Sequence, residues 1–419
     1  MLSPGSKNWV KKYFQLIEEG EIKVDFLKPS KEEIMHFLHA EFFQSGVMFG
    51  YPCKLIFANN LDQTTWTLDE TLKVLLLESL LKTYLVFYEK LDEEDFLNEF
   101  NQFIDVFESR GFEFAFPKLK TPDNYSKLES ILEKRIHGRK KWSNIFWTSY
   151  LNNSLVFLDV VGFFDYLNNE HSINAESSKF AESCVTTIAL AAYADGKLDK
   201  AEENVLNVFY SAQGVKSSYV NFLKKNANSL NFEDVPLPKN SSLLFRLFLL
   251  DLAAMTVFSD LITEDEERYF LQMFCKHLGL TREDLNKSIV LIESFVISNN
   301  HKITFLQEMS TYDRLYSNFS KRWIKVLGRN KDKLVDELKN NKELLELVNK
   351  SAIKELSEEE KEKVKTQFKE LIRSMPALAI FMLPGGALLL PIITRVIPDL
   401  LPNSFRNNQI NKSNDEKNN

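Results

Sequence analysis

The segment that most restricts the fold of this chain is a run of uncharged residues near its C-terminus. No charged residue occurs from Met375 to Ile393, and a helix of that length, rising about 1.5 Å per residue, approaches the roughly 30 Å of a bilayer core. Prolines recur in it at spacings of eight, seven and seven residues, and would lie on nearly one face of a continuous helix. They are Pro376, Pro384, Pro391 and Pro398, with Pro402 after them. The run predicts a membrane-spanning segment or, alternatively, a buried and broken helical hairpin in a soluble domain.

The prolines are compatible with a membrane helix. Each one removes a backbone donor and frees the carbonyl four residues earlier, and neighbouring side chains, water or local 3₁₀ turns can satisfy that carbonyl within a membrane. Gly385 and Gly386, directly after Pro384, can equally open a re-entrant turn. More Lys and Arg residues precede the segment than follow it, which favours a cytosolic N-terminal body.

Motifs on both sides of the segment form a recognisable pattern. They are Leu356-Ser-Glu-Glu-Glu-Lys361, Leu371-Ile-Arg-Ser-Met-Pro376, the proline series, and Leu401-Pro-Asn-Ser-Phe405. Together they resemble the membrane segment of the LETM family, the leucine zipper and EF-hand-containing transmembrane proteins of the mitochondrial inner membrane. The Pro-Gly-Gly form and the C-terminal position are most similar to the bacterial members of this family, which are linked to biofilms.

The resemblance implies a protein of the bacterial inner membrane whose helical body lies in the cytoplasm and serves as a binding or scaffold module. If the segment does not span a bilayer, the chain is expected in the cytoplasm. Two functions of the mitochondrial members stand as alternatives, namely cation/proton exchange, which would use a homo-oligomer of the segment, and ribosome binding.

Two departures from the family pattern bear on these alternatives. Ala387 stands where the mitochondrial proteins carry an acidic residue, and the sequence has no ionisable residue between Arg373 and Arg395, whereas an ion path usually contains one. The ribosome-binding region of the mitochondrial proteins also extends well beyond the membrane segment, but only residues 406–419 follow Phe405 here. Both alternatives are weakened accordingly.

The composition predicts an all-α fold of multi-helix bundles. Glycine and proline are few, with 13 and 12 residues among 419, and 44% of the residues are hydrophobic, so long helices with buried cores are expected. The expected division is an N-terminal helical domain at 1–170, a second helical domain at 171–300, a charged connector at 301–374, the hydrophobic segment at 375–405 and a disordered polar tail at 406–419.

The charge and the cysteines exclude several classes of protein. A net charge of −7 argues against direct DNA binding, which requires clustered Lys and Arg. One basic stretch, Lys134 to Trp142, is interpreted as a solvated turn between helices. The cysteines Cys53, Cys184 and Cys275 are odd in number and far apart, which indicates neither a disulfide framework nor a zinc site.

Capping boxes mark the start of two helices in the first domain. Ser30 with Glu33, and Thr67 with Glu70, have the required spacing, so helices should begin near residues 31 and 68. Further helices are expected at 93–109, 123–135 and 142–167. In the last of these, Trp142, Trp147, Phe157 and Phe163 are predicted to be core residues.

One pair of residues in the first domain has the spacing of a metal motif. Glu33 and His36 are separated like the carboxylate and imidazole of di-iron bundles, but such a site needs a second copy, which the sequence lacks. We therefore expect His36 to be exposed on the surface, and His39 to add little.

Two related units follow in the second domain, each with a helix of small residues, a tight turn and a new helix. They span Thr187–Tyr210 and Leu252–Phe274. Turn and capping chemistry explains most of their pattern, with Asp199–Glu202 and Thr263–Glu266 as capping boxes. The pattern also resembles the TerB-like fold of tellurite-resistance proteins, in which a similar acidic cluster is associated with metal. That resemblance makes the following residues candidates for weak divalent-cation binding: Asp195, Asp199, Glu202, Asp260 and Glu266.

The remaining helices complete the expected architecture. The very apolar stretch Ser241–Phe258 should lie at the centre of its domain. Two exposed helices are expected at 331–349 and 357–374, the second capped by Ser357 and Glu360. The sequence contains no nucleophile–base pair, phosphate-binding loop or ligand-spaced group of Cys and His, so no enzymatic activity and no cofactor beyond the weak cation are predicted.

Overall fold

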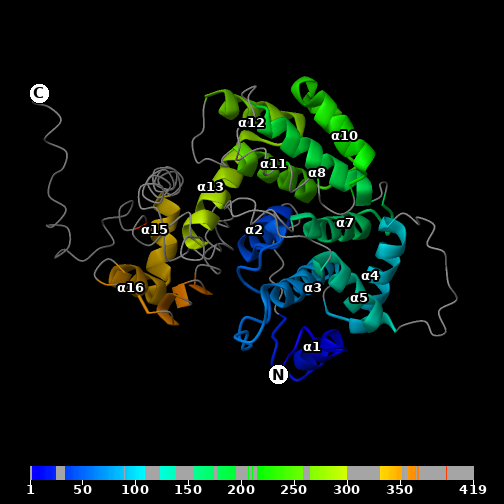
Figure 1. Ribbon diagram of the computed structural model, residues 1–419. Helices are drawn as coiled ribbons and strands as arrows, with labels where there is room; N and C mark the ends of the chain where they lie inside the picture. The colour runs from blue at the N-terminus through cyan, green and yellow to red at the C-terminus, as the bar shows by residue number, and fades with distance from the viewer. Residues whose placement is uncertain are drawn as a thin grey trace, which may run out of the picture. The chain divides into compact units, whose positions relative to one another are not determined.

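The computed structural model describes residues 2–24, 34–88, 90–108, 123–137, 154–173, 177–194, 215–257, 265–299 and 331–351, together with 206, 210, 354, 356–357, 359–361, 363–364, 366–367 and 393. Every regular element in these residues is a helix (Figure 1), which confirms the all-α prediction. Within these ranges, each helix is too short or too polar to cross a bilayer.

The chain divides into two compact units. The first contains residues 1–292 and 303–305, and the second contains residues 293–302 and 306–419. The helices of the first unit are α1 (Trp9–Glu18), α2 (Ile34–Ser45), η1 (Val47–Phe49), α3 (Leu68–Phe87), α4 (Glu93–Phe107), α5 (Asn124–His137), η2 (Ser154–Val156), α7 (Phe157–Asn168), α8 (Ser177–Ala192), α10 (Ser217–Asn226), η3 (Ala227–Ser229), η4 (Phe232–Asp234), α11 (Leu243–Val257) and α12 (Asp265–His277). Helix α13 (Arg282–Asn299) begins in the first unit and ends in the second, which also contains α15 (Lys331–Asn340) and α16 (Lys342–Ser351). The finer expected boundary at residue 170 stays a prediction.

Local capping chemistry sets the start of α3 as the sequence predicts. The Thr67 hydroxyl accepts a hydrogen bond from the Glu70 backbone N–H at 3.2 Å, and the Thr67 N–H donates to the Glu70 carboxylate at 2.7 Å. These two bonds form a complete capping box. The corresponding pair Ser30 and Glu33 lies outside the described residues.

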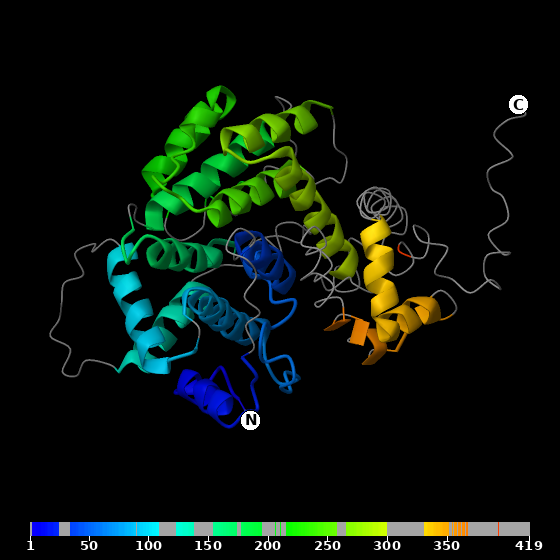
Figure 2. The same ribbon diagram turned by 180° about the vertical axis from the view of Figure 1, so that it is seen from behind.

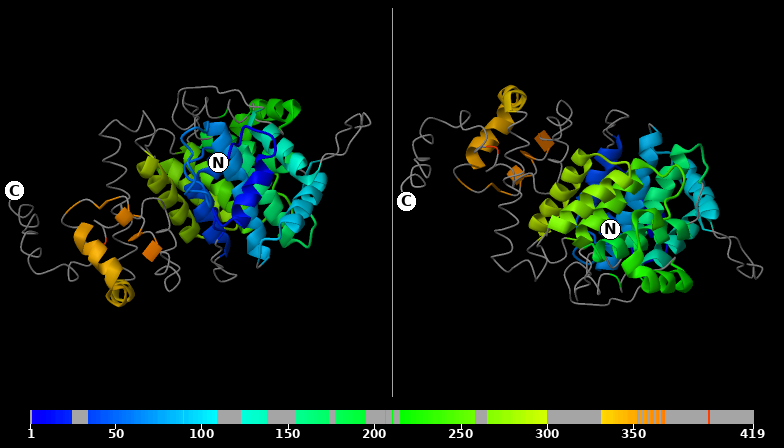
Figure 3. Two further views of the ribbon diagram at one scale, coloured as in Figure 1. Left: turned by 90° about the horizontal axis from the view of Figure 1, so that it is seen from below. Right: turned by 90° about the horizontal axis from the view of Figure 1, so that it is seen from above.

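The helices of the first unit form three layers. Helices α8 and α10 to α12 lie on one side, α1, α3 and α5 lie on the other, and α2 and α7 lie between them (Figures 1 and 2). Seen from below, the blue N-terminal helices lie in front of the green ones, and seen from above the order is reversed (Figure 3). Helix α11 packs against α8, α2 and α12 and is buried along almost its whole length. The prediction that this apolar helix lies at a centre is confirmed.

Aromatic side chains fill the interface of α4 and α7. Phe163 packs against Phe96, Phe100 and Phe103 with ring centroids 5.4–6.3 Å apart, within the range of favourable aromatic pairs. Phe157 and Phe163 are fully buried, which confirms their predicted core role. Trp142 and Trp147 lie outside the described residues.

The prediction of a solvated turn at Lys134–Trp142 is wrong for its first part. Lys134 to His137 form the last turn of α5, and the side chain of Arg135 is only 19% exposed. Its guanidinium donates to Asp159 of α7 and to Glu108 after α4, each at 2.6 Å, and the attraction of Asp159 raises the pKa of Arg135. The charge is therefore used to join three segments within the fold. Residues 138–142 lie outside the described part.

The second unit corrects the prediction of two exposed helices. The expected helix at 331–349 is interrupted at Asn341, whose side-chain oxygen accepts a hydrogen bond from the Leu344 N–H at 3.0 Å and begins α16. The apolar side chains of α15 and α16 are buried, and so is Val364 beyond them: Leu334, Leu338, Leu344, Val348 and Val364. The predicted cap at Ser357 is confirmed, because Ser357 and Glu360 exchange hydrogen bonds of 3.0 and 3.3 Å.

Candidate functional site

Two histidines of α2 lie at the meeting point of three helices. His39 forms a hydrogen bond from Nε2 to Asp251 Oδ2 of α11 at 2.6 Å, and both side chains are buried, with exposed fractions of 3% and 0%. The other carboxylate oxygen of Asp251 accepts a hydrogen bond from the Ser288 hydroxyl of α13. A single buried carboxylate thus joins α2, α11 and α13.

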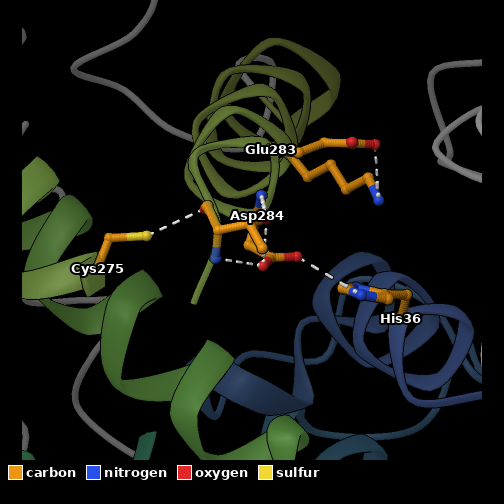
Figure 4. Close-up of polar contacts among 6 residues, drawn as sticks. His36, Cys275, Glu283 and Asp284 are labelled. Atoms are coloured by element: carbon orange, nitrogen blue, oxygen red, sulfur yellow. Dashed lines mark hydrogen bonds and ion pairs between the residues drawn. The ribbon is translucent and has the colours of Figure 1, made fainter. Parts of the chain in front are cut away.

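His36 makes the second contact, one helical turn earlier on α2. Its Nε2 lies 3.5 Å from Asp284 Oδ1 of α13 (Figure 4). The other oxygen of Asp284 accepts hydrogen bonds from the Thr281 N–H and hydroxyl, each at 2.7 Å, and the Thr281 hydroxyl accepts one from the Asp284 N–H. This reciprocal arrangement is a capping box. Asp284 therefore begins α13 and also contacts α2.

An ion pair of α13 and the thiol of Cys275 lie near this cluster. Glu283 and Lys287 of α13 form an ion pair of 3.2 Å. Burial and then the nearby Lys287 lower the pKa of His36, although Asp284 acts in the opposite direction. Cys275 donates from Sγ to the Thr281 carbonyl at 3.1 Å (Figure 4), and burial raises the pKa of its thiol to about 11. A thiol that stays protonated at neutral pH is a poor nucleophile, so the cluster has no activated cysteine.

These positions correct the expectation for the two histidines. His36 is not exposed on the surface but half-buried, with 29% of its side chain accessible, and His39 is a central buried residue rather than a minor one. One signal in the sequence could have indicated this. Asp251 is a lone acid in the apolar run of α11, and a buried acid requires a hydrogen-bonding partner.

Another buried carboxylate of the first unit belongs to Glu78 of α3. It accepts hydrogen bonds from the Tyr13 hydroxyl at 2.8 Å and from the backbone N–H groups of Ile56, Phe57 and Ala58. Its side chain is fully buried, and burial raises its pKa to about 7. These contacts fasten α1 and the chain after η1 to α3. These hydrogen bonds stabilise the fold and do not indicate a binding site, since every donor is a backbone N–H group or the Tyr13 hydroxyl.

A cleft of about 540 Å³ lies at the N-terminus of α3. It is lined by Gly5, Thr67, Leu68, Asp69, Glu70, Lys73 and Glu133. Thr67 and Glu70 are engaged in the capping box, and Lys73 forms an ion pair of 2.9 Å with Glu133. The polar groups of the cleft thus serve the helix, and the arrangement does not indicate catalysis.

The candidate cation residues of the TerB-like units are not brought together in the described part of the chain. Asp195, Asp199, Glu202 and Asp260 lie outside the described residues, and Glu266 is described only as a member of α12. Across the described ranges, no three His, Cys, Asp or Glu side chains are placed to hold a metal ion together. The cation site stays a prediction.

The membrane-segment residues also stay untested. Pro376, Pro384, Gly385, Gly386, Pro391, Pro398, Pro402 and Phe405 all lie outside the described residues.

Comparison with known proteins gives one match, to the C-terminal part of the chain. A family model described as "LETM1-like, RBD", a ribosome-binding domain, matches residues 356–419. Neither the curated proteins nor the solved structures gave a match. The LETM-like resemblance of the C-terminal motifs is thereby supported. The matched residues include the hydrophobic segment itself, so the shortness of the tail after Phe405 no longer argues against ribosome binding.

Proposed function

We propose that the chain is a membrane-associated, LETM1-like protein without catalytic activity, which binds ribosomes through residues 356–419 and uses its helical body as a scaffold. The observation that supports this proposal is the match of those residues to the LETM1-like ribosome-binding family. The sequence motifs around the proline series agree with the same assignment.

The described part of the second unit suggests that the binding module is longer than the matched region. Gln367, within the match, accepts a hydrogen bond from the Asn341 side chain at 2.7 Å and donates one to Glu343 at 2.8 Å. Lys350 of α16 forms an ion pair with Glu360, and Leu356 and Val364 are buried. Helices α15 and α16 therefore support the start of the matched region, so the module should be handled as residues 331–419.

The test is co-sedimentation of the full chain with purified ribosomes at increasing salt. We expect binding at low salt that weakens as salt rises, because contacts with RNA phosphates are salt-dependent. A truncation that ends at Glu355 should not sediment. A second truncation, which ends at Phe405, tests whether the tail after Phe405 is needed for binding. Equal sedimentation of the chain that ends at Glu355, or no sedimentation of the full chain at low salt, would reject the proposal.

Membrane association is tested separately by carbonate washing. We propose that the full chain resides in the bacterial inner membrane with its N-terminal body in the cytoplasm, whereas a truncation that ends at Ser374 is released by the wash. If the full chain is also released, residues 375–402 are a buried helical hairpin, and the partners should be sought in the cytoplasm.

We also propose that the middle of the chain is a TerB-like unit that binds a divalent cation weakly. The support is the acidic turn pattern of Asp195, Asp199 and Glu202, repeated at Asp260 and Glu266. Millimolar calcium or magnesium should raise the melting temperature through binding to the folded state, and Asp195→Ala should abolish that rise. A melting temperature that does not respond to either cation leaves only the capping role.

The assignment to the biofilm-linked bacterial type rests on the Pro-Gly-Gly form of the segment and its C-terminal position. It is tested by comparing biofilm formation in cells that produce the full chain with that in cells that produce the truncation ending at Ser374. Biofilm formation at the same level in both would remove this part of the proposal.

A further inference from the structure

Helix α10 lies at the outer edge of the first unit, where it packs against α8 (Figures 1 and 2). Its buried residues are Val220 and Leu223, which lie on one side of the helix because they are three positions apart. The opposite side carries Phe222, which is 46% exposed, and the exposed Lys225. Single exposed apolar residues are common on protein surfaces, so the charges around Phe222 decide what this side of the helix can bind.

The charge of α10 is opposite to that of the whole chain. The chain has 59 acidic residues among 419 and a net charge of −7, but the stretch from Asn204 to Phe232 contains no acid. Lys216, directly before α10, and Lys224 and Lys225 within it are all exposed. In the part of the chain that the structure describes, no carboxylate is placed to form an ion pair with any of the three. Their charges are therefore available to a partner.

The acids nearest to α10 lie on the side that faces α8. Burial and then the carboxylates of Glu182 in α8 and Asp234 in η4 raise the pKa of Tyr219. The Tyr219 hydroxyl is hydrogen-bonded to Thr186 of α8 at 2.7 Å, so this side chain points toward α8. The carboxylates that act on Tyr219 thus lie toward the packed side of α10, away from the solvent side with Phe222.

We propose that the solvent side of α10, formed by Phe222, Lys224 and Lys225, docks the first unit on a bilayer surface rich in anionic lipid. An aromatic ring beside lysines is typical of helices that lie in a membrane interface. The ring enters the boundary between headgroups and acyl chains, and the lysine ammonium groups contact the lipid phosphates. The other exposed residues of this side, Ser218 and Asn221, are small and uncharged, so they allow close approach.

The residue types favour lipid over RNA as the partner. Helix α10 contains no arginine, the residue that pairs with phosphates in a bidentate manner and stacks on bases. RNA binding also depends on a larger cluster of Lys and Arg than these lysines provide. The contact lies outside the matched region at residues 356–419, so it does not rest on the proposed ribosome binding.

The test is hydrogen exchange of the full chain with vesicles of phosphatidylcholine that contain phosphatidylglycerol, and with vesicles of phosphatidylcholine alone. We expect the amides of residues 217–226 to exchange several-fold more slowly with the anionic vesicles at low salt, and to be unchanged by the neutral ones. Added salt should remove the protection, because it screens the attraction between surface charges. The readout is local to α10, so it is valid whether or not residues 375–402 insert into the bilayer.

Variants separate the lysines from the aromatic ring. Lys224→Gln combined with Lys225→Gln should remove most of the protection, since each lysine near an anionic surface strengthens binding several-fold. Phe222→Ser should reduce the protection and keep its dependence on lipid charge. These side chains are exposed, so the variants should fold. The charge-matched control is Lys11→Gln combined with Lys134→Gln, at exposed positions on α1 and α5, and it should behave like the wild type.

Several outcomes would overturn the proposal. They are an absence of protection with anionic vesicles, equal protection with both kinds of vesicle, full protection in the Phe222 variant or the α10 lysine variant, and loss of protection in the control. Protection of residues 217–226 by polyuridylate RNA, without protection by anionic vesicles, would overturn it in favour of RNA as the partner.

Discussion

Glu78 shows how a single buried carboxylate makes the stability of the fold depend on pH. Its folded-state pKa of about 7 is raised from 4.5, so folding takes up a proton between these values. The resulting stability is fully present below about 4.5 and is lost as pH rises through about 7. The difference corresponds to about 3 kcal/mol of unfolding free energy. Glu78→Gln should therefore unfold with a much flatter pH dependence than the wild type.

The measurement for Glu78 is urea unfolding at several pH values from about pH 5 to about pH 8. Glu78→Gln should also be less stable than the wild type at the acidic end, because its amide nitrogen cannot accept from the backbone N–H groups of residues 56–58. Glu94→Gln, at an exposed position on α4, is the control and should keep the wild-type pH dependence. A Glu78→Gln curve parallel to the wild type would show that this carboxyl does not titrate on folding.

Gly162 tests the aromatic packing between α4 and α7. A Cβ at this position would lie 2.8 Å from the Phe107 ring and 3.1 Å from Phe103, too close for the rings to stay where they are. Gly162→Ala gains about 1 kcal/mol in helix propensity, but the overpacking costs about 1–3 kcal/mol. We expect a net loss of up to about 2 kcal/mol in urea unfolding, partly restored by Phe107→Leu. Stabilisation by Gly162→Ala alone would contradict this packing.

At the residue scale, the distance along the sequence decides which contacts could be predicted. Thr67 and Glu70 are three residues apart, so their spacing alone indicated the capping box. His39 and Asp251 are separated by 212 positions, and Glu78 binds backbone groups 20–22 positions away. No local pattern contains such contacts. The expectations for His36 and His39 are wrong for this reason, although Asp251, the lone acid of the apolar helix α11, is evident in the sequence.

At the scale of elements, Asn341 decides where one helix ends and the next begins. Its side chain caps α16 by accepting from the Leu344 N–H at 3.0 Å and also donates to Gln367. Asn341→Ala should cost about 1 kcal/mol, the usual value of an N-cap, and should speed hydrogen exchange at the start of α16. Asn341→Asp keeps the cap acceptor but loses the donor to Gln367, so exchange at the start of α16 should be close to that of the wild type. If the two variants show the same exchange at the start of α16, the side-chain acceptor of residue 341 does not stabilise that helix start.

The interruption at Asn341 also explains an error in the predicted elements. The stretch from Lys331 to Asn349 has helical periodicity and contains no glycine or proline, so the pattern favours one uninterrupted helix. The break is made by the Asn341 side chain, which caps α16 and also donates to Gln367, 26 positions later. It lets α15 and α16 pack on each other. The start of α3 was predicted within a residue because its capping box precedes an apolar run, whereas a lone Asn inside an uninterrupted helical pattern gives no such signal.

At the scale of the whole molecule, the described chain consists of two units with separate sets of stabilising contacts. The network of His39, Asp251 and Ser288 lies entirely in the first unit, and the Asn341 cap lies in the second. Units with separate cores can unfold in separate steps. A substitution at His39 should therefore affect the first unit, and one at Asn341 the second.

Calorimetry of the full chain should show two unfolding transitions that respond to different substitutions. His39→Ala removes the hydrogen-bond partner of the buried Asp251 carboxylate, and loss of one member of a buried polar pair typically costs about 3–5 kcal/mol. We expect it to lower the melting temperature of the first unit and to leave the other transition in place. Asn341→Ala should lower only the other transition, and by less. If either substitution moves both transitions by the same amount, the two units unfold as one cooperative body, and the contacts of α13 must then couple them.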